Sequence, residues 1–166
     1  FEDCDDLYDF NQFSQCIDEM AKDYDTVLIS MIGYDIQQGF DKKYRNKGYR
    51  IVSSGTRNDP YFLNRQRDLM ELADMTISNN IGTHIGYSIC LGTPHYIFNQ
   101  DITSIKKAAS AQASDHLQAI RDREYAEIKA VFNSREPIIT PEQIAVVKKY
   151  WGPFEIKPKF YANTQE

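Results

Sequence analysis

The chain contains a short apolar run, Thr26-Val27-Leu28-Ile29-Ser30-Met31-Ile32, which stops at Gly33. A run of aliphatic and β-branched residues of this length predicts a strand buried on both faces, as in a parallel sheet. We expect a helix over 36–47, because Gly48 stands where a helix commonly ends. The run therefore indicates the first strand–helix unit of an α/β fold.

The same alternation continues along the chain. We expect further strands over 49–54, 75–78 and 94–98, with one helix after Asp59-Pro60 and another over 82–91. Strands separated by helices imply parallel pairing with right-handed crossovers. The predicted fold class is α/β, a Rossmann-like open parallel sheet with flanking helices and a helical C-terminal extension.

The length of 166 residues fits a single domain. We expect its core over about 24–100, a helical extension over about 103–152 and a mobile tail over 153–166. In the extension, one helix is predicted from 104 to about 132. A second should begin at Thr140-Pro141, where a hydroxyl cap and a proline precede Gln143. The chain opens on Phe1 rather than Met, and its first residues read like an internal segment of a longer sequence, so we expect it to be part of a longer protein.

Charge and composition narrow the function. The formal net charge is −5, from 19 basic and 24 acidic residues, which argues against a surface that binds nucleic acid. No apolar run reaches the roughly 18 residues of a membrane span, so we expect no transmembrane segment. Cys4, Cys16 and Cys90 have neither metal-ligand nor disulfide-framework spacing, and we predict no metal site. These features favour a cytoplasmic protein.

Two strand-to-helix junctions are candidate binding sites, because ligands of open α/β sheets collect at the carboxyl ends of the strands. The first reads Ser53-Ser54-Gly55-Thr56-Arg57-Asn58-Asp59-Pro60. Arg57 suits a phosphate because its guanidinium offers paired donors and stays charged. Gly55 and Thr56 complete this candidate site. The alternative is a plain turn in which a surface Arg57 pairs with Asp59.

The second junction reads Ser78-Asn79-Asn80-Ile81-Gly82-Thr83-His84-Ile85-Gly86. Asn79, Asn80, Gly82 and Thr83 place small and polar groups at a helix start, where free amides and the helix dipole favour anions. We predict that a diphosphate binds at this turn, the alternative being a structural turn. His84 is a candidate donor to a phosphate or a sugar hydroxyl, or else a residue that caps the turn.

Fewer residues are candidates for a catalytic role than for ligand binding. Asp35, just beyond the first strand, is placed to contact a ribose or an acceptor, or to cap the following helix. His95 lies inside a predicted strand, and we expect it to be packed structure. No paired carboxylates and no Ser-His-Asp set emerge, so the catalytic residues stay unassigned.

Segments 48–60 and 71–83, completed by 86–94, carry a family resemblance. Residues 25–98 resemble the C-terminal, donor-binding half of GT-B glycosyltransferases, particularly those of bacterial capsule and surface-polysaccharide assembly. The likeness is close over less than half of the chain.

The resemblance implies a nucleotide-sugar donor with its diphosphate near Asn79, Gly82 and Thr83, and Arg57 as a candidate for the phosphates. It implies no separate cofactor. It also implies an N-terminal acceptor-binding domain in the full-length protein, which would carry the catalytic base. If the acceptor is lipid-linked, as is common in such pathways, the resemblance further implies that the full-length protein associates peripherally with membranes.

The sequence departs from that family in one helix, and two alternatives to it remain open. Many donor domains of that family hold the ribose with a glutamate in the last helix, whereas Thr83-His84-Ile85-Gly86-Tyr87 carries no carboxylate. The sequence is also similar to nucleoside deoxyribosyltransferases at Gly82-Thr83-x-x-Gly86-Tyr87 and Leu91-Gly92-x-Pro94, although their glutamate nucleophile is missing. The second alternative is a non-catalytic binding or scaffold domain of the same fold.

Overall fold

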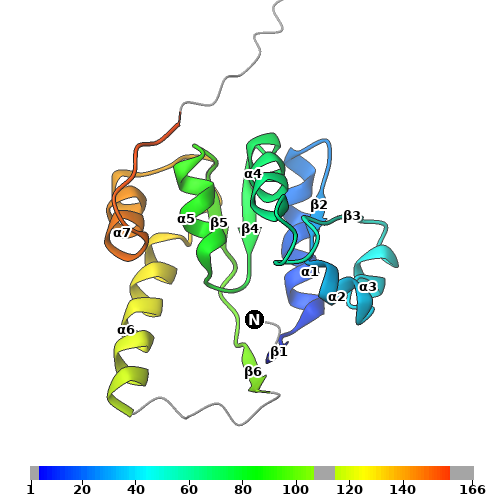
Figure 1. Ribbon diagram of the computed structural model, residues 1–166, viewed down its shortest axis with the longest axis horizontal. Coiled ribbons are helices and arrows are strands. Elements are labelled where there is room, and N and C mark those ends of the chain that lie inside the picture. The colour runs from blue at the N-terminus through cyan, green and yellow to red at the C-terminus, as the bar shows by residue number, and fades with distance from the viewer. Residues whose placement is uncertain (1–3, 107–114, 158–166) are drawn as a thin grey trace, which may run out of the picture.

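A computed structural model describes residues 4–106 and 115–157 of the chain. The fold is mixed α/β (Figure 1). The strands are β1 (Cys4–Leu7), β2 (Leu28–Ser30), β3 (Arg50–Val52), β4 (Thr76–Ser78), β5 (His95–Ile97) and β6 (Thr103–Lys106). The helices are α1 (Phe10–Met20), α2 (Gly33–Gln37), α3 (Lys42–Arg45), α4 (Phe62–Leu72), α5 (Thr83–Cys90), α6 (Asp115–Val131) and α7 (Pro141–Trp151), with a 3₁₀ turn at Ala21–Asp23.

All four predicted strands form, and they form parallel pairs. In the first pair Ile29 of β2 lies opposite Ile51 of β3, and in the second Ile77 of β4 lies opposite Tyr96 of β5. The sequence predicts one continuous sheet, whereas the described strands pair only as β2–β3, β4–β5 and an antiparallel β1–β6. Each strand of the parallel pairs is three residues long, which leaves few backbone groups for a further neighbour.

Two hydrophobic clusters hold these pairs in place. One is centred on Phe13, Ile17 and Tyr44, and both Ile29 of β2 and Ile77 of β4 pack against it. The two parallel pairs therefore share a core without sharing hydrogen bonds. The second cluster joins α5, β5, α6 and α7 through the buried residues Ile85, Ile89, Ile97, Ile128, Phe132, Val146 and Val147.

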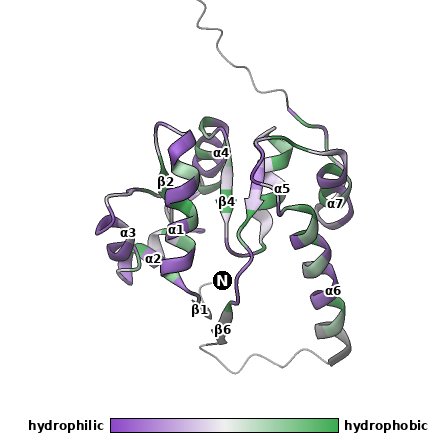
Figure 2. Ribbon diagram, turned by 180° about the vertical axis from the view of Figure 1, so that it is seen from behind, coloured by the Kyte–Doolittle hydropathy of each residue, from purple (hydrophilic) through white to green (hydrophobic). Residues whose placement is uncertain are grey.

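The distribution of hydropathy follows this arrangement. Figure 2 shows mainly hydrophilic residues on α3 at one end of the molecule and a mixed pattern on α6 and α7 at the other. The strands and α5 lie between these ends (Figure 1).

The first helix was not foreseen from the sequence. Asp9 caps α1 by accepting a hydrogen bond from the Gln12 amide at 3.0 Å. Phe10, Phe13 and Ile17 follow at helical spacing, and the last two are buried. An N-cap aspartate before an apolar pattern of this period is a helix signal, so α1 was predictable.

Two predicted helices differ from the structure. The helix expected over 36–47 is broken into α2 and α3, because Gly39 between them adopts a φ of +79°. The helix expected from 104 begins only at Asp115 in the described residues, and Thr103–Lys106 instead forms β6. β6 pairs with β1, which is distant in sequence, with Cys4 opposite Lys106.

The last helix follows its sequence signal. The Gln143 amide donates to Thr140 Oγ1 at 3.2 Å, and the Thr140 amide donates to Gln143 Oε1 at 3.0 Å, which completes the predicted capping box. Beyond α7 the chain packs on α5, where the Lys157 amide donates to the Cys90 carbonyl at 3.0 Å. The first residues of the predicted mobile tail are thus anchored, and residues 158–166 lie outside the described part.

Candidate functional site

The carboxyl ends of β2 and β3 are tied together by their loops. The Gly33 amide donates to the Gly55 carbonyl at 2.9 Å, and a Cβ on Gly33 would lie 3.3 Å from Thr56 Cγ2. Gly55 has a φ of +90°, a conformation that other residues adopt only with strain. Asp35 lies in the first turn of α2, directly beyond Gly33. The structure therefore gathers Asp35, Gly55 and Thr56 at one edge.

An arginine that the sequence analysis overlooked holds this junction. Arg65 Nη1 of α4 donates to the Ser54 carbonyl at 3.2 Å and to Asp59 Oδ2 at 2.6 Å. The hydrogen bond from Arg65 is the largest of the effects that lower the pKa of Asp59. Arg57, the predicted phosphate ligand, is exposed beside this turn. No local spacing rule connects Asp59 with Arg65, because their contact depends on how α4 folds back over the turn.

The second junction is an ordered turn from β4 into α5. Ser78 Oγ donates to the Asn80 carbonyl at 2.8 Å, and the Ile81 amide donates to Asn80 Oδ1 at 2.8 Å. Gly82 is the N-cap of α5, and no side chain caps the helix there. A Cβ on Gly82 would lie 2.9 Å from His84 Nδ1, so the turn leaves no room for a larger residue.

The start of α5 is therefore open to an outside acceptor. The first amides of a helix have no partner within the helix, and the helix dipole places partial positive charge there. Thr83, the first residue of α5, is exposed. The predicted residues Asn79, Asn80, Gly82 and Thr83 do come together at this point.

His95 is held by hydroxyl groups on both ring nitrogens. Its Nδ1 lies 2.7 Å from Thr76 Oγ1, and its Nε2 lies 2.9 Å from Ser78 Oγ. The side chain is fully buried, and burial, with the neighbouring His84, lowers its pKa well below the usual value. The prediction that His95 is packed structure is confirmed.

His84 has one paired and one unpaired ring nitrogen. Its imidazole forms a hydrogen bond with the Asn80 backbone, while Nε2 is buried without a partner. Burial lowers the pKa of His84 to about 4, against a small raising effect of the Asn80 hydrogen bond. The ring centres of His84 and His95 are 5.4 Å apart. At neutral pH His84 is therefore uncharged and packed beside a second neutral histidine.

Among the described residues, the buried side-chain atoms that lack a hydrogen-bond partner are Asn79 Nδ2, His84 Nε2 and both amide atoms of Gln100. Asn79 directly follows β4, and Gln100 comes three residues after β5. Because Ser78 lies opposite Ile97 in the parallel register, both strands deliver these side chains to the same edge. A buried polar group without a partner costs about 1–3 kcal/mol. This edge thus holds unused hydrogen-bonding capacity.

Two cavities lie beside these elements. One of about 570 Å³, with polar and apolar surface in about equal parts, is formed by Asn99, which precedes Gln100, and by the α6 residues Tyr125 and Lys129, among others. A mainly apolar one of about 330 Å³ lies between α4 and α5, with Leu63, Met70 and Tyr87 in its wall. The predicted site residues line neither cavity.

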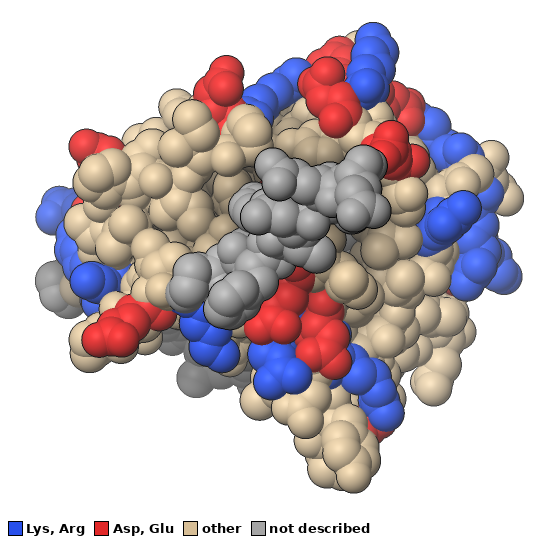
Figure 3. Space-filling view, turned by 90° about the horizontal axis from the view of Figure 1, so that it is seen from above, with Lys and Arg blue, Asp and Glu red and all other residues tan. Residues whose placement is uncertain are grey.

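Surface charge, metal-ligand residues and helix hydropathy bear on which other kinds of partner the protein could bind. In Figure 3 acidic and basic side chains alternate around the visible face, and no continuous basic surface is seen on it. Within residues 4–106 and 115–157, no three His, Cys, Asp or Glu residues gather as a metal site would require. No helix of that same part is both long enough and apolar enough to cross a lipid bilayer.

No protein-family model matches this chain, and no curated protein and no solved structure matches it significantly. The function has to be argued from the site itself.

Proposed function

We propose that the carboxyl edge of β4 and β5 binds a nucleotide-diphosphate sugar, and that the chain is the donor-binding part of a glycosyltransferase of bacterial surface-polysaccharide assembly. One observation carries the proposal. The start of α5, which no side chain caps, lies at the carboxyl edge of β4 and β5, where Asn79 Nδ2, His84 Nε2 and the amide group of Gln100 are buried without a hydrogen-bond partner among the described residues. A polar ligand bound at this edge could form several hydrogen bonds with the protein at once.

The arrangement of the strands agrees with a nucleotide-binding fold. We interpret the pairs β2–β3 and β4–β5 as neighbouring halves of a Rossmann-like sheet, because Ile29 and Ile77 pack against one cluster. Ligands of such sheets bind beyond the carboxyl ends of the strands. The candidate residues follow β2, β3 and β4 at those ends.

The diphosphate is proposed to lie at the first amides of α5. The absence of a Cβ on Gly82 lets the backbone come close to the ligand, and Thr83 adds an exposed hydroxyl. Arg57, exposed at the junction after β3, would supply positive charge to the phosphates. Neither group requires a bound metal.

Catalysis is proposed to require the N-terminal acceptor-binding domain of a longer protein, in the cytoplasm or at the membrane surface. The resemblance to GT-B enzymes implies that the catalytic base belongs to that domain. α5 carries no carboxylate, so no observation favours the deoxyribosyltransferase alternative. By itself, this chain is expected to bind donor weakly and to turn over little.

Calorimetric titration with a panel of nucleoside diphosphates and nucleotide sugars tests the proposal. We expect one saturable ligand, bound at least tenfold more weakly by Thr83→Val and by Arg57→Ala, a loss of about 1.4 kcal/mol. Matched controls are Thr26→Val and Arg67→Ala, two exposed positions outside the proposed site. If no nucleotide binds up to millimolar concentration, or if the control variants lose as much affinity, the proposal is wrong.

A further inference from the structure

The hydrogen bonds around Asn80 define which nitrogen of His84 carries its proton. The Asn80 carbonyl accepts from Ser78 Oγ at 2.8 Å, and the backbone of Asn80 also bonds the His84 imidazole. Since Nε2 has no partner, the ring nitrogen in that bond is Nδ1. A carbonyl oxygen can only accept, so Nδ1 bears the hydrogen and neutral His84 presents a lone pair at Nε2.

The surroundings keep that lone pair free of a proton. Only burial and the Asn80 hydrogen bond act appreciably on the pKa of His84, which lies at about 4. The titratable group in ring contact is His95, whose own pKa is lowered well below the usual value, so it too is neutral at pH 7. At pH 7 about one molecule in a thousand carries a protonated His84.

A phosphate is a poor partner for this nitrogen. The ionised oxygens of a diphosphate accept hydrogen bonds and donate none, so they would face the lone pair of Nε2. A hydroxyl group both donates and accepts. It can donate to His84 Nε2 while its oxygen accepts from an amide donor, such as Asn79 Nδ2 at the same edge of β4 and β5.

The other unpartnered atoms fit the same ligand chemistry. Asn79 offers a donor, and Gln100 offers both a donor and an acceptor, each of them buried. A pair of adjacent hydroxyls on a sugar ring presents two donors and two acceptors within reach of one another. Amide side chains are suited to such a pair because they can donate and accept at once.

We propose that His84 Nε2 accepts a hydrogen bond from a hydroxyl of the ligand, so that Asn79, His84 and Gln100 recognise a sugar ring rather than a phosphate. The idea rests on the proposed function only in taking that ring to be the ribose or the transferred sugar of the donor. It changes the expected role of His84 from a donor to phosphate into an acceptor from a hydroxyl. The phosphates then lie at the amides of α5, away from the imidazole.

Nitrogen NMR of the ¹⁵N-labelled chain reports the protonation of each histidine nitrogen directly. We titrate the protein with three kinds of probe: neutral nucleosides and hexoses, inorganic pyrophosphate, and nucleotide sugars. We expect hydroxyl-bearing probes to shift the Nε2 signal of His84 while the ring stays neutral, and pyrophosphate to leave it in place. Formation of an imidazolium with any bound phosphate probe would overturn the inference, as would the absence of any response of His84 to every probe.

Two variants add a readout that does not depend on the NMR assignment. His84→Gln keeps an acceptor and should retain sugar binding within about threefold, whereas His84→Leu should lose it at least tenfold. Equal losses in both variants, with both folded by their amide spectra, would contradict a role as acceptor.

The outcomes for the two proposals are separable. Nucleotide-sugar binding that protonates His84 leaves the proposed function standing and removes this inference. Binding of neutral sugars without any nucleotide binding leaves this inference standing and removes the proposed function.

Discussion

A Cβ atom on Gly86 would lie 2.9 Å from Cγ of Trp151 and 3.2 Å from its Cβ. Gly86 is a buried position within α5, and Trp151 is the last residue of α7. Glycine within a helix costs about 1 kcal/mol relative to alanine, so its presence needs a tertiary reason. That reason is the close approach of the two helices at this position.

We expect Gly86→Ala to destabilise the protein despite the gain in helix propensity. The added methyl group would have to displace the indole of Trp151, and overpacking of this kind typically costs about 1–3 kcal/mol. Urea unfolding of the wild type and the variant measures the change in the free energy of unfolding.

A double-mutant cycle with Trp151→Leu is the control. If the clash is the cause, Gly86→Ala should cost less in the Trp151→Leu background. The same cost in both backgrounds would rule out the contact as the source. Gly48→Ala is a second control. An added Cβ at Gly48 would have no atom within 4 Å, whereas its φ of +86° strains any residue other than glycine, so this variant measures backbone strain without a steric clash.

We expect stability to fall between pH 6.5 and about pH 4. Folding lowers the pKa of His84 from its usual 6.5 to about 4, so the unfolded chain takes up a proton first as the pH falls. The stability that neutral His84 provides is complete above pH 6.5 and is lost on the way to pH 4, by up to about 3 kcal/mol. His95, whose pKa is lowered too, acts in the same direction.

His84→Gln should flatten the dependence of the unfolding free energy on pH in this window. The carboxylates with lowered pKa, such as Asp18, act at lower pH, because their usual pKa is 3.8. A variant as sensitive as the wild type between pH 6.5 and 4 would show that His84 is protonated in the folded protein.

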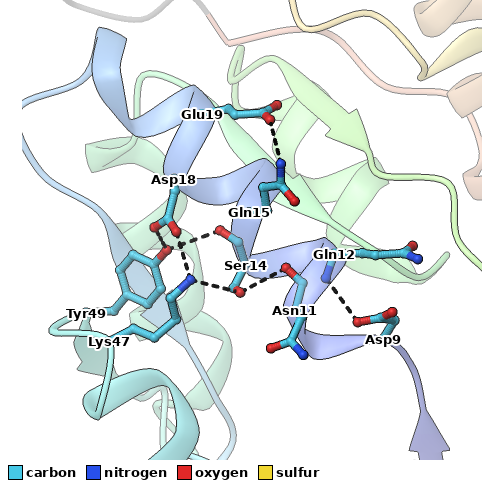
Figure 4. Close-up of polar contacts among 9 residues, drawn as sticks. All are labelled: Asp9, Asn11, Gln12, Ser14, Gln15, Asp18, Glu19, Lys47 and Tyr49. Atoms are coloured by element: carbon cyan, nitrogen blue, oxygen red, sulfur yellow. Dashed lines mark hydrogen bonds and ion pairs between the residues drawn. The ribbon is translucent and has the colours of Figure 1, made fainter.

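A polar cluster anchors α1 to the segment before β3 (Figure 4). Lys47 Nζ donates to Ser14 Oγ at 3.0 Å and to Asp18 Oδ2 at 2.7 Å. The Tyr49 hydroxyl bonds the Asp18 carboxylate and lies 3.3 Å from the Ser14 carbonyl. Hydrogen bonds from Lys47 and then Tyr49 lower the pKa of Asp18.

We expect Tyr49→Phe to reduce the free energy of unfolding by about 1 kcal/mol, since it removes a hydrogen bond to a charged partner at a half-buried position. Lys47→Met should cost less, because exposed ion pairs contribute about 0–1 kcal/mol and are screened by salt. Chemical denaturation at low and high salt compares the two. A larger loss in Lys47→Met, or no loss in Tyr49→Phe, would contradict this order.

The cap of α7 should be worth about 1 kcal/mol. Thr140→Val keeps the shape of the side chain but removes the oxygen that accepts from the Gln143 amide, so α7 should lose stability by that amount. Thermal unfolding measures it, with Thr26→Val as an exposed control outside the helices. Equal effects at both positions would show that the capping bond is not the cause.

The sequence contained enough to predict the strands near residues 28, 51, 77 and 96, the helices α4, α5 and α7 and the capping box at Thr140. These features follow from local rules, namely apolar runs, glycines at helix ends and hydroxyl caps, which act within a few residues. α1 was predictable by the same rules, through Asp9 and the apolar spacing after it. The break at Gly39 was also a local signal, but the surrounding helical pattern concealed it.

The residues of the candidate site likewise fall into those that the sequence predicted and those that it did not. Sequence reasoning placed Asn79, Gly82 and Thr83 at a strand-to-helix turn, and the structure forms that turn. It did not foresee Arg65 on Asp59 or the unpartnered amide of Gln100, because these depend on which residues distant in sequence become neighbours.

By itself, then, the sequence determined where parallel strands and most helices occur, because side-chain period and backbone freedom are properties of short segments. Only the tertiary structure decided that the strands pair two by two, that β1 joins β6, and that Trp151 packs on Gly86. It also decided that the imidazole of His84 is buried, which lowers its pKa to about 4, and that its Nε2 has no partner among the described residues. Pairing, packing and burial join residues far apart in the chain, and no local pattern encodes them.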